Sequence, residues 1–342
     1  MKTILITGAA GFIGFHLVEA LCQKNYKVIG YDNINDYYAI DLKYARLKEL
    51  GISRTKAENF YEEVKSTKYD FTFYRANLED DTFLDELFAR YTFDTVVNLA
   101  AQAGVRYSIE NPKAYGQSNL VGFLNVLEAC RQYGVKQLLY ASSSSIYGNS
   151  TDVPFTTSQN VDHPISLYAA TKKANELMAH SYSHLYGIQT IGLRFFTVYG
   201  PWGRPDMAMF LFTDAILNGR PLKVFNHGDL SRDFTYIDDI IQGITKIILT
   251  TTTSVPYQLY NIGNSKPVQL MDFIRAIEQS TGIEAKLDFL PMQPGDVNQT
   301  WADVDDLMKQ FDYQPNFPVE KGVQNFVDWY KSYYKLTAVS SK

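Results

Sequence analysis

The sequence predicts an α/β fold built on a doubly wound parallel sheet, with a smaller mixed α/β domain toward the C-terminus. Up to residue 196, short runs rich in β-branched residues alternate with longer amphipathic runs. Strands that alternate with helices form βαβ units, whose strands are parallel. Beyond that point nine prolines, from Pro201 to Pro318, divide the chain into short elements. We therefore expect a first domain over 1–196, which a later segment near 233–262 rejoins, and a second domain mainly over 197–335.

The elements of the first domain follow in order along the chain. Strands are expected at 2–7, 26–32, 71–74, 95–99, 136–140 and 190–194, and helices at 11–22, 81–91, 121–133 and 167–186. The stretch 33–70 is too long for an ordinary connection, so it should hold a helix near 42–50 and a surface loop. An aromatic-rich helix over 323–334 should close the second domain.

Composition excludes several classes of protein. The chain is 46% hydrophobic and 20% charged, with a net charge of −5, so a folded globular protein is expected and a nucleic-acid binder is not. No apolar stretch approaches the roughly 20 residues that span a bilayer. The two cysteines, Cys22 and Cys130, cannot build a disulfide framework or a four-ligand zinc site. We expect both to be buried thiols of a cytoplasmic protein without a metal site.

Three glycines mark a dinucleotide site of the Rossmann type. Gly8, Gly11 and Gly14 stand where the first strand turns into the first helix, so the backbone can approach a pyrophosphate at the helix N-terminus. Asp32 ends the second strand, where its carboxylate can bind both ribose hydroxyls. A carboxylate there repels a 2′-phosphate, so the sequence predicts NAD rather than NADP.

Two later strand ends face the same edge of the predicted sheet. Asn77 and Leu78 follow the third strand and could reach the adenine. Leu99, Ala100, Ala101 and Gln102 follow the next strand, where small residues would let the backbone approach the cofactor. On spacing alone, an ordinary structural turn explains the second segment nearly as well.

A tyrosine and a lysine carry the expected acid–base chemistry. Tyr168 and Lys172 are spaced i and i+4, which puts the phenol and the ammonium on one face of a helix. A phenol with a pKa near 10 is a poor base at neutral pH, so we expect the Lys172 charge and the nicotinamide to lower the pKa of Tyr168. A run of serines at 142–145 follows a strand and offers a hydroxyl that can relay a proton to Tyr168.

Three further motifs carry a resemblance that covers nearly the whole chain, roughly residues 2–330. They are Ala101–Ser108 (AQAGVRYS), Arg194–Asp206 (RFFTVYGPWGRPD) and Arg232–Asp239 (RDFTYIDD). With the motifs above, the sequence resembles the extended short-chain dehydrogenase/reductase family, within it the UDP-sugar 4-epimerases, and among these the UDP-glucuronate 4-epimerases. The resemblance implies reversible C4 epimerisation of UDP-glucuronate to UDP-galacturonate by hydride transfer to bound NAD, rotation of a 4-keto intermediate and hydride return. It also implies a homodimer joined through the helices near 121–133 and 167–186.

The resemblance also implies roles for individual residues. Tyr168 is the base, Lys172 its partner, and Ser143, ahead of Ser145, the relaying hydroxyl. The implied cofactor contacts are Gly8, Gly11, Phe12, Ile13, Gly14, Asp32, Asn33, Asn77, Leu78, Leu99, Ala100, Ala101, Gln102, Asn119, Tyr168 and Lys172. The implied substrate contacts are Arg204, Thr197, Arg232, Asp296, Ser142, Ser143, Ser144, Val224, Phe225 and Phe210. Among them Arg232 would anchor the diphosphate and Asp296 would be a ribose or phosphate-loop residue. Val224, Phe225 and Phe210 would lie around the uracil, although aromatic residues in such loops belong to the core about half the time.

Some positions depart from the family pattern. Asn77 replaces the usual Asp near the adenine, Asn98 replaces a common His, and Gln293 stands near where galactose epimerases often carry an Arg. Ser144 and Ser145 occupy the positions at which the related 4,6-dehydratases carry an Asp–Glu pair. A dehydration therefore lacks its acid and base in this sequence.

The uronate assignment depends on Arg204. A guanidinium binds a carboxylate through a planar fork, and Thr197, seven residues earlier, is a plausible neutral partner. Oxidation at C4 of a glucuronide makes a β-keto acid that readily loses CO₂, so our hypothesis is that Arg204 and Thr197 hold the carboxylate out of alignment with the ketone. Alternatives are a UDP-glucuronate decarboxylase, a 4-epimerase of a neutral or N-acetylated UDP-hexose, and an NAD-sensing binding protein, which would be expected to lose the Tyr168–Lys172 pair.

Overall fold

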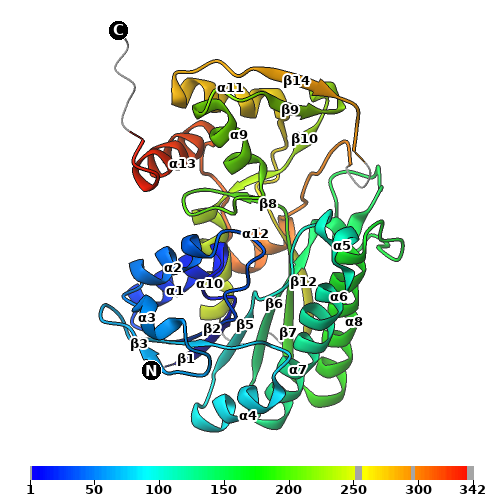
Figure 1. Ribbon diagram of the computed structural model, residues 1–342. Coiled ribbons are helices and arrows are strands. Elements are labelled where there is room, and N and C mark those ends of the chain that lie inside the picture. Colours follow the sequence, from blue (N-terminus) through cyan, green and yellow to red (C-terminus); the bar gives the residue numbers. More distant parts are fainter. Residues whose placement is uncertain (1, 251–255, 294–296, 337–342) are drawn as a thin grey trace.

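The computed structural model describes residues 2–250, 256–293 and 297–336, and it is built around one large, mostly parallel sheet (Figure 1). The strands stand in the order β12-β7-β6-β5-β1-β2-β4-β3, and only the short β3 runs antiparallel to its neighbour. Their bounds are β1 (Thr3–Thr7), β2 (Lys27–Asp32), β3 (Val64–Lys65), β4 (Phe71–Arg75), β5 (Thr95–Asn98), β6 (Gln137–Ser143), β7 (Gln189–Phe195) and β12 (Tyr257–Ile262). The strand order reverses between β1 and β5, which is where open α/β sheets bind ligands at the carboxyl ends of their strands.

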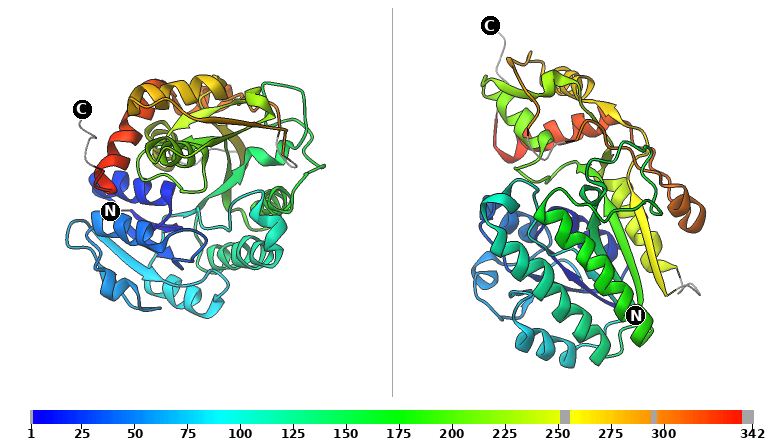
Figure 2. Two further views of the ribbon diagram at one scale, coloured as in Figure 1. Left: turned by 45° about the horizontal axis from the view of Figure 1, so that its top comes forward. Right: turned by 90° about the vertical axis from the view of Figure 1, so that its right-hand side faces the viewer.

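Hydrophobic residues on both faces of the strands explain why the sheet is covered on both sides. Ile4 and Ile6 of β1 belong to a different buried cluster from Leu5, as the alternation of strand side chains requires. The side of Ile4 and Ile6 is covered by α1 (Phe12–Gln23) and α10 (Ile237–Leu249), which contact each other. The side of Leu5 is covered by α4 (Asp81–Arg90), α7 (Gly122–Gln132) and α8 (Leu167–Tyr186), of which α7 and α8 lie side by side in Figure 2. The predicted doubly wound fold is confirmed.

The expected elements are observed with shifted boundaries, and two of these shifts reflect tertiary contacts. The helical path into α7 begins well before residue 121, with α5 (Tyr107–Glu110), α6 (Pro112–Tyr115) and a π-helical turn, η1 (Gly116–Val121). β6 extends to Ser143 and is followed by a 3₁₀ turn, η2 (Ser144–Tyr147), so half of the serine run lies inside the strand rather than after it. A local pattern cannot show either feature, because pairing with β7 extends the strand and packing on α8 holds the π turn.

The stretch 33–70 contains the expected helix and also further structure. α2 (Ile40–Glu49) is followed by the short α3 (Arg54–Ala57), and β3 then pairs with β4 at the edge of the sheet. Leu42 and Leu47 of α2 are buried in the same cluster as α1, so this stretch packs on the dinucleotide-loop side of the sheet.

The C-terminal part of the chain lies over the carboxyl ends of the strands (Figure 1). Among its described residues, the strands form three small two-stranded sheets, β8 (Thr197–Tyr199) with β11 (Phe234–Tyr236), β9 (Leu222–Phe225) with β14 (Leu287–Leu290), and β10 (Ser231–Arg232) with β13 (Val268–Gln269). Its helices are α9 (Ala208–Leu217), α11 (Leu270–Thr281), α12 (Asp305–Phe311) and α13 (Val319–Tyr333), with a 3₁₀ turn η3 (Asn226–Gly228). The segment 233–262 returns to the large sheet, because its β12 pairs with β7.

No helix within residues 2–250, 256–293 and 297–336 is both long and apolar enough to cross a membrane.

Candidate active site

The glycine-rich turn between β1 and α1 is closely packed. Gly8 has a φ of +73°, and a Cβ on it would lie 2.8 Å from the amide nitrogen of Ala100. A Cβ on Gly14 would lie 2.1 Å from the carbonyl oxygen of Gly8. The turn therefore requires glycine at both positions, and it brings the loop after β5 against the start of α1, where Phe12 and Ile13 lie.

Asp32 is held at the end of β2 by backbone amides. Its Oδ2 accepts a hydrogen bond from the Ala10 nitrogen at 3.1 Å and its Oδ1 accepts one from the Ile34 nitrogen at 2.8 Å. Asn33 follows it, and its side chain accepts from the Asn35 nitrogen. The carboxylate is thus fixed at the sheet edge beside the glycine turn, as a ribose-binding group requires.

The π turn η1 places Asn119 between the loop after β5 and the helix α8. Its Oδ1 accepts from the Gln102 nitrogen at 2.7 Å, and its Nδ2 donates to Gln102 O at 3.0 Å and to the Thr171 hydroxyl at 3.1 Å. Single π turns inside helices often accompany functional sites. Asn119 therefore couples the segment 99–102 to the residue that precedes Lys172.

The turn after β4, which holds Asn77 and Leu78, makes contacts with neighbouring elements of the fold. The carbonyl of Asn77 accepts a hydrogen bond from the Tyr31 hydroxyl at 2.6 Å. Leu78 is buried beneath Gly122, and its carbonyl accepts from Asn125. The backbone of this turn is thus fixed on the side of the sheet that α4 and α7 cover, and the Asn77 side chain is only partly buried.

Tyr168 and Lys172 lie at the first turns of α8, next to the end of β6. Ser166 caps the helix by accepting from the Ala169 nitrogen at 3.1 Å. The Lys172 ammonium is buried, donates to the Ala141 carbonyl at 2.9 Å and lies 5.9 Å from the centroid of the Tyr168 ring. The helical spacing thus brings the phenol and the ammonium together on the face that packs on the sheet.

The pKa of Tyr168 is shifted in the opposite direction to the sequence-based expectation. Burial raises it, the hydrogen bond with Ser143 and the Arg204 charge act to lower it, and the Asp206 charge raises it. Burial also lowers the pKa of Lys172, to about 8. The apolar packing of the site, which the sequence pattern did not reveal, is the dominant influence on both groups in the protein alone.

The four serines have distinct surroundings. Ser143 interacts with Tyr168, and the Ser145 hydroxyl donates to Ser143 Oγ at 2.9 Å, so Ser145 stands behind Ser143 in a short chain of hydroxyls. Ser144 is partly buried in the turn η2. Ser142 is 2% exposed and donates to Glu176 Oε1 at 2.7 Å, so the expectation that it binds substrate is wrong: its hydroxyl belongs to a buried network.

Arg204 lies in the neighbourhood of Tyr168 and is paired with a carboxylate of its own loop. Its Nε donates to Asp206 Oδ1 at 3.0 Å and its Nη2 donates to Asp206 Oδ2 at 2.5 Å. Tyr37 donates its hydroxyl to the same Oδ2 at 3.0 Å. Thr197 begins β8, where its amide donates to the Asp233 carbonyl and its side chain is partly buried.

Two of the aromatic and apolar residues expected around the uracil are committed to packing. Phe210 is buried among rings of α13, 5.9 Å from the Phe326 centroid and 5.2 Å from that of Tyr330, so it joins α9 to α13. Val224 is fully buried in the small cluster beneath β9. Its side chain and that of Phe210 are not available to a base, which corrects both expectations. Phe225 remains half-buried, with the Arg106 guanidinium 5.5 Å from its ring centroid.

Two further expected substrate contacts are the diphosphate anchor, Arg232, and the ribose or phosphate-loop residue, Asp296. Arg232 lies on β10 and donates to the carbonyls of Ser231 at 2.9 Å and Asn298 at 3.1 Å. Asp296 lies outside the described residues.

Sequence reasoning overlooked Tyr37, Asp206 and Arg46. Asp206 could have been noticed, since it stands two residues after Arg204 in the same motif. Tyr37 and Arg46 come from the stretch 33–70, and nothing in their local sequence indicates that they reach a loop more than 150 residues away, as the contacts of Tyr37 with Asp206 and of Arg46 with Trp202 show.

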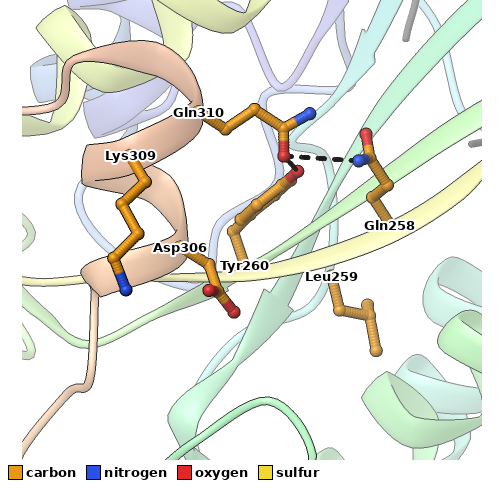
Figure 3. A pocket seen from close by; sticks show the side chains of 6 residues that line it. All are labelled: Gln258, Leu259, Tyr260, Asp306, Lys309 and Gln310. Atoms are coloured by element: carbon orange, nitrogen blue, oxygen red, sulfur yellow. Dashed lines mark hydrogen bonds between the residues drawn. The ribbon is translucent and has the colours of Figure 1, made fainter. Parts of the chain in front are cut away.

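A hollow of about 410 Å³ lies elsewhere, against the outer edge strand β12 (Figure 3). It is lined by Gln258, Leu259, Tyr260, Asp306, Lys309 and Gln310, and the hydroxyl of Tyr260 and the amide of Gln258 both donate to Gln310. Its strand residues belong to a single edge strand rather than to the β1–β5 switch point, so we do not assign it to the site.

Comparison with known proteins agrees with this geometry. Residues 4–263 match the NAD dependent epimerase/dehydratase family. The chain is 51% identical to "Protein CapI" of Staphylococcus aureus, over 97% of this chain and 99% of that protein. It is 44% identical to a probable UDP-glucuronate 4-epimerase of Rhizobium meliloti, over 97% of each chain.

Among solved structures, the UDP-glucuronic acid 4-epimerase of Bacillus cereus in complex with UDP-glucuronic acid and NAD is similar. Its TM-score is 0.87 at 32% sequence identity, and the match covers 97% of this chain and 100% of that one. With the glycine turn, the fixed Asp32 and the Tyr168–Lys172 pair described above, the matches place the chain in the NAD dependent epimerase/dehydratase family.

Proposed function

We propose that this protein is a UDP-glucuronate 4-epimerase that interconverts UDP-glucuronate and UDP-galacturonate with bound NAD. The observation that carries the proposal is that Arg204 and Tyr168 belong to one cluster of contacts. Arg204 pairs with Asp206, which accepts from Tyr37. The Tyr37 and Tyr115 hydroxyls both face Gly104, and the Tyr115 ring lies 6.0 Å from that of Tyr168. One site thus combines a base for a sugar hydroxyl with a guanidinium for a carboxylate. UDP-glucuronate and its C4 epimer UDP-galacturonate both present a sugar hydroxyl at C4 and a carboxylate.

The residues at the glycine turn fit NAD. A Cβ on Gly8 or Gly14 would clash with backbone, and the Asp32 carboxylate is held by two amides at the end of β2. We propose that the turn Gly8–Gly14 binds the diphosphate, that Asp32 binds the adenosine ribose, and that Asn33, Asn77, Leu78, the segment 99–102 and Asn119 complete the site. Bound NAD supplies hydride removal from C4 of the sugar and hydride return to it.

The chain's own residues handle the proton of the 4-hydroxyl. Tyr168 Oη accepts that proton, directly or through Ser143, and returns it after the sugar has presented its other face. The Lys172 ammonium stabilises the tyrosinate by its charge, and Ser145 orients the Ser143 hydroxyl. General acid–base catalysis of this kind contributes about 10²–10⁴ in rate.

Arg204 and Thr197 hold the substrate carboxylate in this proposal. Once C4 is a ketone, the sugar is a β-keto acid, and loss of CO₂ requires the C5–carboxylate bond to align with the ketone π-system. Fixing the carboxylate in a planar fork keeps that bond out of alignment. A decarboxylase would need the reverse, so product analysis separates the two activities.

Incubation of the purified protein with UDP-glucuronate should give UDP-galacturonate, read by ¹H NMR, without release of CO₂. UDP-glucose and UDP-N-acetylglucosamine should react at least about tenfold more slowly, because each lacks the carboxylate that Arg204 would bind. Formation of a UDP-pentose would favour the decarboxylase, and equal rates on all three sugars would favour a general UDP-hexose epimerase. No turnover of any of them would favour an NAD-sensing binding protein.

We further propose how the chain divides this work. Residues 1–196, with 233–262, would hold NAD, and 197–335 would mainly hold the UDP-sugar. The return of β12 to the large sheet supports that division. Both cysteines are unpaired and buried, which supports a reducing cytoplasm as the location.

We propose a homodimer joined through α7 and α8. These helices expose apolar side chains, including Leu124 at 40%, Leu177 at 58% and Leu185 at 65%. Replacement of Leu124 and Leu177 together by Glu should yield monomers in sedimentation velocity, because two buried charges per subunit would have to be desolvated at the interface. A matched double replacement by Glu at exposed Met308 of α12 and Phe289 of β14 should sediment like the parent, and an unchanged mass for the first variant would refute this interface.

A further inference from the structure

The fork of Arg204 is already half occupied. Asp206 accepts hydrogen bonds from Nε and Nη2 in a parallel, bidentate arrangement. A guanidinium has five N–H groups, so three remain after this pairing, two on Nη1 and one on Nη2. Only the outer edge, between Nη1 and Nη2, can still take a second carboxylate in bidentate fashion.

Asp206 is itself held from a distant part of the chain. Tyr37, in the loop between β2 and α2, donates to Asp206 Oδ2 at 3.0 Å. Its ring lies 4.8 Å from that of Tyr107 and 6.0 Å from the Arg204 guanidinium. Gly104, at a φ of +102°, leaves room for it, because a Cβ there would lie 2.5 Å from the Tyr37 hydroxyl.

The backbone that leads into Arg204 is fixed by the same stretch. Arg46 of α2 is fully buried and donates to the carbonyls of Trp202 at 2.6 Å and Gly203 at 3.4 Å. It also donates to Ala10 O in the glycine turn at 3.0 Å and to the Tyr38 hydroxyl at 2.7 Å. The residues 37–46 thus hold both the loop before Arg204 and the side chain of Arg204.

The Asp206 carboxylate is suited to this task at neutral pH. Burial would raise its pKa, but the Arg204 charge and the hydrogen bonds from Arg204 and Tyr37 outweigh burial, so the pKa of Asp206 lies below its usual value. The pair Arg204–Asp206 is therefore ionised and neutral overall. The pair therefore acts on an incoming carboxylate mainly through the fixed orientation of the Arg204 N–H donors, and less through a net positive charge.

We propose that Asp206 and Tyr37 are positioning residues that set the specificity of this site: they fix the Arg204 guanidinium so that its outer Nη1–Nη2 edge receives the carboxylate of the substrate. The inference rests on the proposed function and names how that function selects a uronate. The inference also makes a prediction for a neutral sugar. When such a sugar binds, Arg204 is not left as an unpaired cation, because Asp206 already balances its charge. Binding of a neutral UDP-hexose should then depend little on either positioning residue.

The test is a set of dissociation constants for the NAD-loaded protein, measured by calorimetry with UDP-glucuronate, UDP-glucose and UDP. Asp206→Asn keeps the size of the side chain but has one acceptor oxygen, and its NH₂ would face donors. It should weaken UDP-glucuronate binding by about 10–100-fold, the range for hydrogen bonds to charged groups, while UDP and UDP-glucose change by less than about threefold. Tyr37→Phe should act in the same direction by about 3–10-fold, and Arg204→Ala should abolish the preference for the uronate.

Two controls separate positioning from general damage. Asp214 of α9 has the same kinds of partner as Asp206, an arginine and a tyrosine. It pairs with Arg220 and accepts a hydrogen bond from the hydroxyl of Tyr330 on α13 at 2.8 Å. Asp214→Asn should leave the ratio of the UDP-glucuronate and UDP-glucose constants unchanged. Tyr107→Phe should do the same, because its hydroxyl accepts from Asn111 and not from the Arg204 loop.

The other possible results would contradict either the positioning role of Asp206 or the proposed function. Equal losses for all three ligands in Asp206→Asn would make Asp206 a merely structural residue. Unchanged or tighter UDP-glucuronate binding would mean that Asp206 competes with the substrate for Arg204. If the unmodified protein itself bound UDP-glucuronate no more tightly than UDP-glucose, the proposed function would fail, and the role of Arg204 with it.

Discussion

Replacement of Tyr168 by Phe is expected to lower kcat for UDP-glucuronate by about 10²–10⁴-fold, the range that a positioned acid–base group contributes. The change removes one oxygen from a ring that packs 6.0 Å from the Tyr115 ring and leaves the rest of the site in place. Ser143 keeps the hydrogen bond from Ser145, so no buried hydroxyl is left without a partner. Stability should therefore change by no more than about 1 kcal/mol, and KM should change much less than kcat.

The measurement is the initial rate of UDP-galacturonate formation together with a thermal melt. Tyr182→Phe is the matched control, because Tyr182 lies further along the same helix and its hydroxyl donates to Glu128 on α7. That variant should keep at least about half of the parental rate. A Tyr168→Phe protein that retained more than about a tenth of the activity would show that another group removes the proton.

The main sheet could be predicted from the sequence because its strands carry their own signal. Ile4, Leu5 and Ile6 are apolar in succession, as a strand buried on both faces requires, and the glycine turn follows at once. The spacing of Tyr168 and Lys172 likewise places both on one face of α8 without knowledge of the rest of the fold. Features that depend on one element and its immediate neighbours were predictable.

The surroundings of the site were less predictable because they are made by distant segments. Ser142 was expected to face the substrate, yet it donates to Glu176, whose carboxylate also binds the buried Arg194 at 2.9 Å. The raised pKa of Tyr168 in the protein alone was not foreseen for the same reason, since it depends on how completely other elements bury the phenol. The expected effect of the nicotinamide stays a prediction. Phe210 packs on α13, more than a hundred residues later in the chain, and no local pattern reveals that contact.

The role of the stretch 33–70 is the clearest case of information that only the fold provides. By composition it is an insertion rich in Tyr, Lys and Glu between two strands. In the structure its residue Arg46 hydrogen-bonds both the glycine turn and the loop before Arg204. A segment that interrupts the βαβ alternation thus connects the expected cofactor side of the site with the expected sugar side.

Replacement of Lys172 by Met is expected to lower kcat by at least about 10²-fold and, at pH 7, to stabilise the fold. The activity falls because the buried charge that favours tyrosinate is removed. The stability rises because burial lowers the pKa of Lys172 from 10.5 to about 8, which means that the folded protein bears a cost for carrying the ammonium. At about 1.36 kcal/mol per pKa unit this cost is on the order of 3 kcal/mol, offset by about 1 kcal/mol for the lost hydrogen bond to Ala141.

The sign of the pH dependence tests this reasoning independently of activity. Between pH 8 and about 10.5 the unfolded chain holds the Lys172 proton and the folded chain does not, so this residue makes the free energy of unfolding rise with pH across that window. Below pH 8 both states are protonated and the cost is constant. The difference between the parent and Lys172→Met, measured by urea unfolding, should therefore favour the variant at pH 7 and shrink steadily toward pH 10. Lys173→Met on the same helix, which removes a partly exposed ammonium 3.4 Å from Asp162, is the control for loss of a lysine. A pH-independent difference for Lys172→Met would mean that the Lys172 ammonium is not desolvated by the fold.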